Sequence, residues 1–274
     1  LSSGSNDGTS AGNAWQSVDA MIAGVRAGHR VNIKKASSHI SISATKVFPA
    51  GSQAGPIWYR GYEDTIEDGE NVIFSIADTK FIDTAAGPQF FSNMTFNGNS
   101  NSVKSVFVEG HVDSQTTFYK CTFTNNAAGP CVEAREGAFI ACTFENTGSF
   151  SSANYSAFVG SGVCVGCRFK AAGIVCDLSN DEESEHILWF KNTILSDSSE
   201  ARAGIDIDLT FNEGSYATVL ENSFFGAGDG VNISAQDAAY EAACAFIGNV
   251  FADCDQGLNH TGTAVYREQN AILR

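Results

Sequence analysis

One short pattern recurs along this chain: an Asn or Cys followed two positions later by a large apolar side chain. Successive copies lie 21 to 30 residues apart, and the residues before each copy are also similar in kind. The seven copies are Asn93/Phe96, which is one residue longer, Cys121/Phe123, Cys142/Phe144, Cys167/Phe169, Asn192/Ile194, Asn222/Phe224 and Asn249/Phe251. A repeat of this length is one structural unit stacked on the next, so the chain is expected to form a solenoid.

The Asn or Cys of each copy is interpreted as a corner between two strands. Because side chains alternate faces along a strand, the residues two before and two after the corner are predicted to face the same core when the corner bends the chain. The positions two before the corner hold Tyr119, Ile140, Val165, Phe190, Leu220 and Ile247. We therefore expect both sets of apolar residues to form core columns.

A second short run follows each corner and alternates with a period of two. In the run 204–208, Ile205 and Ile207 share one face while Asp206 and Asp208 share the other, which predicts a strand with one buried and one wet face. Two or three strands in a coil of about 25 residues fit a parallel β-helix, and the helical periodicity of βαβ folds is lacking. The predicted class is all-β.

The segments Cys-Thr-Phe-Thr-Asn-Asn (121–126), Cys-Thr-Phe-Glu-Asn (142–146) and Glu-Asn-Ser-Phe-Phe (221–225) resemble the right-handed parallel β-helix superfamily. That superfamily contains pectate lyases, polygalacturonases and many phage tailspike and virion proteins, and the resemblance covers about residues 30–274. It implies a ladder of stacked asparagines at one bend. The ladder residues would be Asn93, Asn192, Asn222 and Asn249, with Cys121, Cys142 and Cys167 in equivalent places, where thiols pack but bond weakly.

The first thirty residues lack the repeat and are predicted to cap the stack. Asn13 can cap an amphipathic helix over 14–27, and Gly28 can end it. An open end of a solenoid exposes core and strand edges, so a cover is a structural need. We predict an N-terminal segment with a capping α-helix over 1–29 and a single β-helix domain over 30–274.

Charge and composition exclude several classes of partner. The net charge is −15 and the pI is about 4.6, which disfavours binding to nucleic acid and to anionic lipid. No apolar run is long enough to span a bilayer, so membrane insertion is not expected. The eight cysteines fit buried thiols best, with disulfides or a metal site as alternatives.

The candidate site lies on the solvent-exposed face of the second runs, which follow the corners. Asp177 and Asp208 are predicted to stack on neighbouring coils, with Asp206, Asn232 and Asn259 in the adjacent column. Carboxylates about 5 Å apart suit a retaining glycosidase or a Ca²⁺ site. A solvated sheet face would carry the same residue types without any function, so Asp177, Asp206 and Asp208 stay candidates for catalysis, and Asp177 and Asp208 for Ca²⁺.

Carbohydrate binding is a further hypothesis. Asn232 and Asn259 could bond to sugar hydroxyls, and strand alternation leaves one of Trp58 and Tyr59 outside, where a ring can stack on a sugar. Core packing is the alternative reading of both rings.

The resemblance bears on catalysis as well. Polygalacturonase-like hydrolases carry Asn-Thr-Asp, Gly-His-Gly and Arg-Ile-Lys, whereas here Ile194 follows Asn192-Thr193 and no Arg-Ile-Lys occurs. We therefore favour a non-catalytic virion decoration or surface-recognition protein. The alternative is a lyase or hydrolase acting on an acidic polysaccharide. Expected partners are other virion proteins or cell-surface glycans, in a homo-oligomer at a virion surface or outside the cell.

Overall fold

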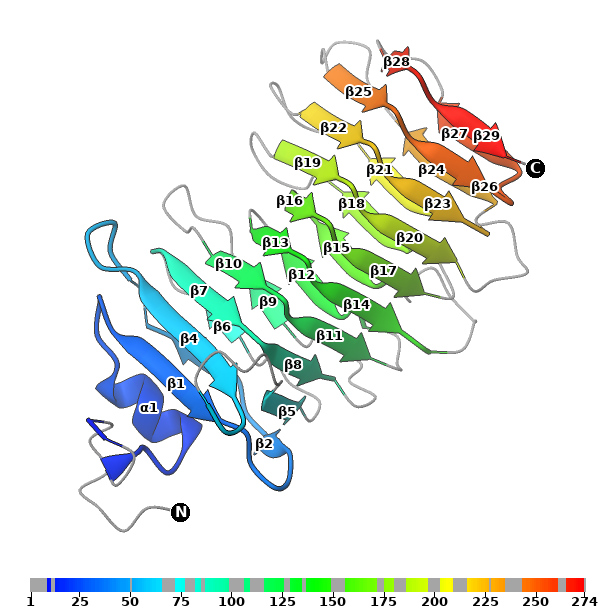
Figure 1. Cartoon of the computed structure of the whole chain (residues 1–274). Coiled ribbons are helices and arrows are strands. Elements are labelled where there is room, and N and C mark those ends of the chain that lie inside the picture. Colours follow the sequence, from blue (N-terminus) through cyan, green and yellow to red (C-terminus); the bar gives the residue numbers. More distant parts are fainter. Residues whose placement is uncertain are drawn as a thin grey trace.

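Three parallel β-sheets run the length of the molecule in the computed structural model (Figure 1). They are called sheets A, B and C here, and each described coil but the last contributes one strand to each sheet in that order. The structure describes residues 9–10, 13–49, 51–65, 72–76, 82–84, 87–98, 106–108, 116–125, 129–134, 137–148, 156–171, 175–179, 186–196, 203–208, 216–226, 228–234, 243–260 and 265–273.

Among the described residues, sheets A and B have ten strands each and sheet C has nine. Sheet A consists of β1 (Arg30–Lys34), β4 (Ile57–Tyr62), β7 (Gln89–Ser92), β10 (Thr116–Tyr119), β13 (Ala138–Ile140), β16 (Gly162–Val165), β19 (His186–Phe190), β22 (Tyr216–Leu220), β25 (Ala243–Ile247) and β28 (Val265–Glu268). Sheet B consists of β2 (Ile40–Ile42), β5 (Val72–Ile76), β8 (Met94–Asn97), β11 (Thr122–Asn125), β14 (Thr143–Asn146), β17 (Arg168–Ala171), β20 (Thr193–Ser196), β23 (Ser223–Phe225), β26 (Val250–Ala252) and β29 (Ala271–Leu273). Sheet C consists of β3 (Lys46–Phe48), β6 (Ile82–Thr84), β9 (Val106–Val108), β12 (Val132–Ala134), β15 (Phe158–Gly160), β18 (Cys176–Ser179), β21 (Ile205–Asp208), β24 (Asp229–Ser234) and β27 (Gln256–His260).

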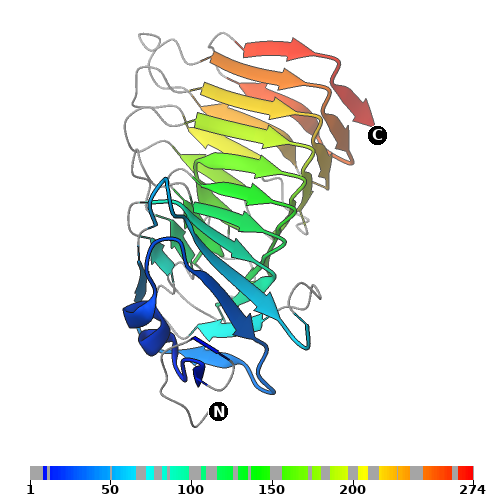
Figure 2. The same ribbon diagram turned by 60° about the vertical axis from the view of Figure 1, so that its left-hand side comes forward.

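Neighbouring coils pair in parallel and in register, which confirms the predicted all-β solenoid. Cys121, Cys142 and Cys167 occupy equivalent places, since β11 pairs with β14 through Phe123 and Phe144, and β14 with β17. Figure 2 shows the strands of successive coils lying one above another along the stack. The repeat in the sequence is therefore the coil itself.

The turn between sheets A and B corrects the predicted core. The residue just before each corner has a left-handed backbone, as at Lys120 (φ 52°) and Lys191 (φ 55°). This residue resets the alternation of side chains, so the residue three before the corner points inward and the residue two before it points outward. Phe118 is fully buried, whereas 44% of Tyr119 is exposed. The prediction that the Tyr119 column is core is wrong, and that column lies on the outer face of sheet A.

Aromatic rings fill the interior in stacked columns. In sheet B, Phe144 stacks on Phe123 at 4.9 Å and on Phe169 at 4.5 Å between ring centroids. In sheet A, Phe118 and Phe139 stack at 5.2 Å with an interplanar angle of 4°. Each such pair contributes about 0.5–1.5 kcal/mol beyond its burial, so the stacked rings stabilise the contacts between the coils that carry them.

The helix at the N-terminal end is shorter than predicted. It is α1 (Val18–Gly24), and the side chain of Ser17, rather than Asn13, caps it by accepting a hydrogen bond from the Ala20 amide at 3.1 Å. Its Met21 is buried in the core, with Trp15 packed against the same cluster. Lys46 of β3 forms an ion pair with Asp19 at 2.6 Å, which holds the helix against the first coil (Figure 1).

All eight cysteines are buried, and none forms a disulfide. Burial raises the pKa of the Cys142 and Cys164 thiols well above the ordinary value, because a thiolate in an apolar interior loses its hydration. These residues act as small apolar groups of the core. Among the described helical residues, no segment has the length and hydropathy needed to cross a bilayer.

Candidate functional site

The corners form a hydrogen-bonded ladder along the axis. The amide oxygen of Asn222 accepts the backbone N–H of Asn192 at 2.8 Å, and its NH₂ group donates to the carbonyl of Trp189 at 3.1 Å. Asn249 and Asn270 repeat this geometry on the following coils. Each asparagine therefore satisfies one backbone donor and one backbone acceptor of the preceding coil, both of which would otherwise be buried without partners.

Three cysteines take the same positions with weaker bonds. The Sγ atoms of Cys121, Cys142 and Cys167 lie 3.6, 3.4 and 3.2 Å from the carbonyl oxygens of Phe91, Phe118 and Phe139. These carbonyls are equivalent to those that the asparagine amides reach. The thiols thus point in the same direction as the amides, but a thiol is a weak donor and offers no strong acceptor.

Two corners differ from the prediction. Asn93 is not a ladder residue: it has φ 56° and occupies the left-handed position, while the buried Met94 takes the corner. The register shows this, because Thr95 pairs with Thr122 directly after Cys121. Asn270 was missed, although Ile272 follows it by two residues and so completes the same pattern.

The predicted stacking of the aspartates is also corrected. Asp177 pairs in register with Asp206, and Asp206 pairs with Asn232. Asp208 lies two residues further along the strand, opposite Ser179. In register, one column of sheet C therefore consists of Asp177, Asp206, Asn232 and Asn259, and Asp208 belongs to a different column. The side chains of Asp177 and Asp208 lie outside the described residues.

Amides and carboxylates alternate in contact on this face. The Nδ2 group of Asn232 donates to Oδ1 of Asp206 at 2.9 Å, and Nδ2 of Asn259 donates to Oδ2 of Asp229 at 3.2 Å. All four side chains are partly exposed. Each bond fixes a side chain between two neighbouring coils, and each amide oxygen and second carboxylate oxygen can still accept from a ligand. We call Asp206, Asp229, Asn232 and Asn259 the polar row.

Glycines bring sheet C close to sheet B beneath the polar row. A Cβ atom at Gly230 would lie 2.2 Å from a ring carbon of Phe251 and 2.7 Å from the carbonyl oxygen of Gly257. Any larger residue would push β24 outward. The glycine that opens these strands in the sequence is therefore required by the packing, and it sets the position of Asn232 two residues later.

The two aromatic candidates lie elsewhere and face opposite ways. Trp58 is 38% exposed on the outer face of sheet A, where it stacks on Phe90 at 4.2 Å. Tyr59 is fully buried and stacks on Phe91 at 4.8 Å. Burial also raises the pKa of the Tyr59 hydroxyl. Tyr59 is thus a core residue that no sugar can reach, and Trp58 is on a different sheet from the polar row.

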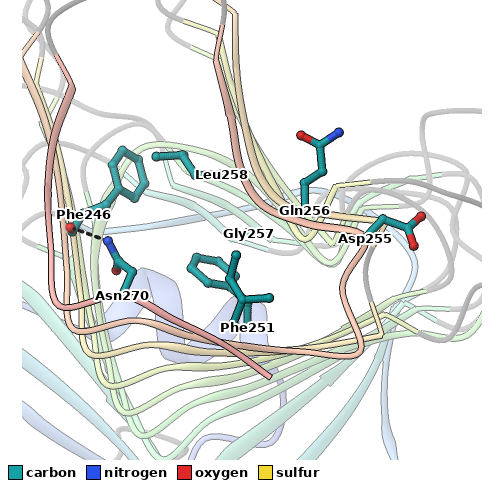
Figure 3. Close-up of a pocket in the computed structure, with 8 residues that line it drawn as sticks. Phe246, Phe251, Asp255, Gln256, Gly257, Leu258 and Asn270 are labelled. Carbon is teal, nitrogen blue, oxygen red and sulfur yellow. Dashed lines mark hydrogen bonds between the residues drawn. The ribbon is translucent and has the colours of Figure 1, made fainter. Parts of the chain in front are cut away.

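A cavity of about 320 Å³ lies at the C-terminal end of the stack. Figure 3 shows Phe246, Phe251 and Leu258 pointing toward it, while Gln256 and Asp255 point away. Its walls are the core side chains of the last coils, and the amide of Asn270 that donates to the Phe246 carbonyl at 2.9 Å borders it. The cavity is the interior of the solenoid seen at its end, and the polar row does not line it.

Metal binding was proposed for Asp177 and Asp208. Within the part of the chain that the structure describes, no three His, Cys, Asp or Glu side chains gather as a metal site would require. Since the two aspartate side chains fall outside that part, the Ca²⁺ hypothesis stays a prediction.

Comparisons with known proteins identify the fold. No protein-family model matches the chain, and no curated protein matches it by sequence. Among solved structures, pectate lyase Pel9A is similar with a TM-score of 0.60 and 14% sequence identity, over 98% of this chain and 76% of that one. A mutant tailspike protein of E. coli bacteriophage HK620 in complex with a pentasaccharide gives a TM-score of 0.33 and 13% identity, over 90% of this chain and 59% of that one. A mutant of the periplasmic alginate epimerase AlgG gives 0.28 and 9%, over 89% and 77%. The chain is a right-handed parallel β-helix with the pectate-lyase-like fold.

Proposed function

We propose that this chain is a rigid, non-catalytic recognition or decoration module that binds glycans through the polar row on sheet C. The observation that carries the proposal is the pairing of Asn232 with Asp206 and of Asn259 with Asp229 across neighbouring coils. Sugars present hydroxyl groups that both donate and accept, and a row of amides and carboxylates offers both functions at fixed positions. Because the paired side chains are held before binding, little conformational entropy is lost when a ligand arrives.

The charge of the chain selects the kind of glycan. A net charge of −15 repels polyanions, so a neutral oligosaccharide is favoured over an acidic one unless a cation bridges the two. The coils repeat about every 4.8 Å, and the row spans several of them. An extended glycan lying along the axis would therefore meet a new amide or carboxylate at every coil. We further propose a location at a virion surface or outside the cell, with cell-surface glycans or other virion proteins as partners.

Binding can be tested by titration calorimetry with neutral and acidic oligosaccharides. Asn232→Ala removes a donor and frees the Asp206 carboxylate, and we expect it to weaken binding of a neutral glycan about 3- to 10-fold, as the loss of one or two hydrogen bonds would. Thr193→Ala changes a half-buried outward residue of sheet B and is the matched control. Glycan binding that responds equally to both variants would place the site elsewhere, and no binding of any glycan would refute the proposal.

A second function is favoured by one observation, the registered pair of Asp177 and Asp206. Two carboxylates on neighbouring strands suit acid and nucleophile roles or a bridging Ca²⁺. A lyase or hydrolase acting on an acidic polysaccharide would use them, and Pel9A, which is named a pectate lyase, shares the fold. The assay is the release of new reducing ends or unsaturated products from acidic polysaccharides, with and without Ca²⁺. Cleavage that disappears in both Asp177→Asn and Asp206→Asn would replace the non-catalytic proposal.

A further inference from the structure

Two rows of outward residues on sheet A contain no charged side chain over seven successive coils. The strands β7, β10, β13, β16, β19, β22 and β25 each present outward the residues four and two before the corner. The first row is Phe90, Thr117, Ala138, Val163, Leu188, Thr218 and Ala245, and the second is Ser92, Tyr119, Ile140, Val165, Phe190, Leu220 and Ile247. We call these residues the apolar face. In a chain whose residues are 17% charged, the absence of any charged side chain from both rows sets this face apart.

The other two sheets do not share this character. Sheet B presents Arg168 outward, and Lys170 pairs with Glu145 at 3.5 Å, while sheet C presents the polar row. On the apolar face, Tyr119, Ile140 and Leu188 are 44%, 38% and 36% exposed. Sheet B also exposes apolar side chains, since Phe225 is 40% exposed, but its outward residues include charged ones and those of the apolar face do not. Figure 1 shows these strands side by side in one continuous sheet.

The size of the face suits a protein interface. Seven strands at about 4.8 Å and a width of about 13 Å give roughly 440 Å² of uncharged surface, which is mostly apolar apart from Ser92, Thr117 and Thr218. A patch of about this size on a monomer is often functional. Adding one strand at each end of the face and one residue at each of its two edges extends the contact area to roughly 900 Å² per copy. This is close to the ~800 Å² that each partner buries in a stable complex.

We propose that two copies of this chain pack together through their apolar faces. Each copy carries a net charge of −15, so two copies can approach closely only where the surface is uncharged, and this face is such a place. Depletion of charge is the compositional mark of the core of an interface. Two sheet faces pack about 10 Å apart with interdigitating side chains. The polar row on sheet C stays accessible, and the inference does not depend on the proposed glycan binding.

Charged residues at the border of the face fit a two-fold arrangement. Along the corner edge, Lys120 lies two coils before Gly166, and Glu221 lies two coils after it. Consider a two-fold axis that lies in the interface, runs parallel to the strands and passes through the coil of Gly166. Rotation about this axis reverses the order of the coils in the second copy and keeps the corner edges of the two copies on the same side. It then places Lys120 of each copy opposite Glu221 of the other. The ammonium group of Lys120 lies 5.1 Å from the Tyr119 ring centroid, so it is already at this edge.

The test is the mass of the full chain in sedimentation equilibrium. The wild-type protein is expected to have twice the monomer mass of 29.0 kDa. Leu188→Glu places a carboxylate from each copy in the apolar contact and is expected to raise the dissociation constant by at least about 100-fold. Thr193→Glu puts the same charge on the outer face of sheet B in the same coil and should leave the dimer intact.

Folding of the variants is controlled in two ways. Circular dichroism checks that Leu188→Glu keeps the β-helix, and Leu188→Thr is a milder variant because Thr117 and Thr218 occupy the same row. It should weaken the dimer about 10-fold, in line with the loss of one interface anchor. A monomeric or trimeric wild-type protein would overturn the proposal. So would equal weakening by Leu188→Glu and Thr193→Glu, or a monomer that binds neutral lipid vesicles through this face.

Discussion

Replacing Asn222 by alanine isolates the contribution of one ladder step. The residue is fully buried, its oxygen accepts the Asn192 N–H at 2.8 Å, and its NH₂ group donates to the Trp189 carbonyl at 3.1 Å. In Asn222→Ala both backbone groups lose their partner inside the protein. A buried polar group left without a hydrogen bond costs about 1–3 kcal/mol. We therefore expect the free energy of unfolding to fall by about 2–6 kcal/mol.

Asn222→Cys is a second variant to compare with Asn222→Ala, because other coils of this chain have cysteine at the equivalent corner. A thiol can still approach the Trp189 carbonyl, as Cys167 approaches that of Phe139 at 3.2 Å, but it gives the Asn192 N–H only a weak acceptor. The loss should be about half that of the alanine variant, roughly 1–3 kcal/mol. Thr193→Ala, a half-buried neighbour on the outer face, is the control and should stay within about 0.5 kcal/mol.

The assay is urea unfolding followed by far-UV circular dichroism, with the midpoint compared at a constant slope. Amide hydrogen exchange adds a local readout, because the Asn192 N–H should exchange faster in Asn222→Ala than in Thr193→Ala. If Asn222→Ala were as stable as Thr193→Ala, or if the Asn192 amide kept its protection, the amide column would not stabilise the stack and the reasoning would be refuted.

Three further predictions concern glycine, cysteine and the core. Gly166 and Gly160 both have positive φ (62° and 110°), but a Cβ atom at Gly166 meets nothing within 4 Å, whereas at Gly160 it would lie 1.8 Å from the Ala134 oxygen. Gly166→Ala should thus cost about 1–2 kcal/mol and Gly160→Ala clearly more, and equal losses in urea unfolding would contradict this. Burial raises the pKa of the Cys244 thiol from 9.0 to about 11. Its contribution to stability is therefore complete below pH 9, and about 3 kcal/mol is lost as the pH rises to 11. In Cys244→Ala the free energy of unfolding should depend less on pH over that range. Phe144→Ala removes a ring stacked between two others and should cost about 3–5 kcal/mol, and a loss below 1 kcal/mol would show that the ring column is not a packed core.

The sequence was sufficient to predict the coil because its length and its corner repeat regularly. Phe123, Phe144 and Phe169 follow their corners by two residues and stack in register, as expected. It was not sufficient to predict the inward face of the strands before the corner. The left-handed residue there is Lys120 in one coil and Lys191 in another. A positive φ is uncommon for lysine, so the residue type does not predict this backbone conformation. Both faces of these strands are also apolar, so hydropathy could not separate the core from the surface.

The errors in the candidate site have equally local causes. Asn93 looked like a corner because asparagine is common both in ladders and in left-handed positions, and only the pairing of Thr95 with Thr122 reveals Met94 as the corner. The second runs open with a glycine, Gly173 in one coil and Gly204 in the next, and alignment by these glycines places Asp177 with Asp208. The structure instead pairs Cys176 with Ile205, because the buried thiol takes the inward place of the isoleucine. The hydrogen bonds of Asn232 and Asn259 depend on that register and could not be derived before it was known.

The change from cysteine to asparagine at the corners divides the stack into two mechanically unequal parts. From Cys121 to Cys167 the corner side chains reach the preceding coil through a thiol, and from Asn192 to Asn270 they reach it through an amide whose oxygen accepts and whose nitrogen donates. Asn192 is the junction, since its oxygen accepts the Cys167 N–H at 2.8 Å. Local unfolding that begins among the cysteine coils should therefore stop at Asn192. The asparagine coils should open together and at a higher free energy than the cysteine coils.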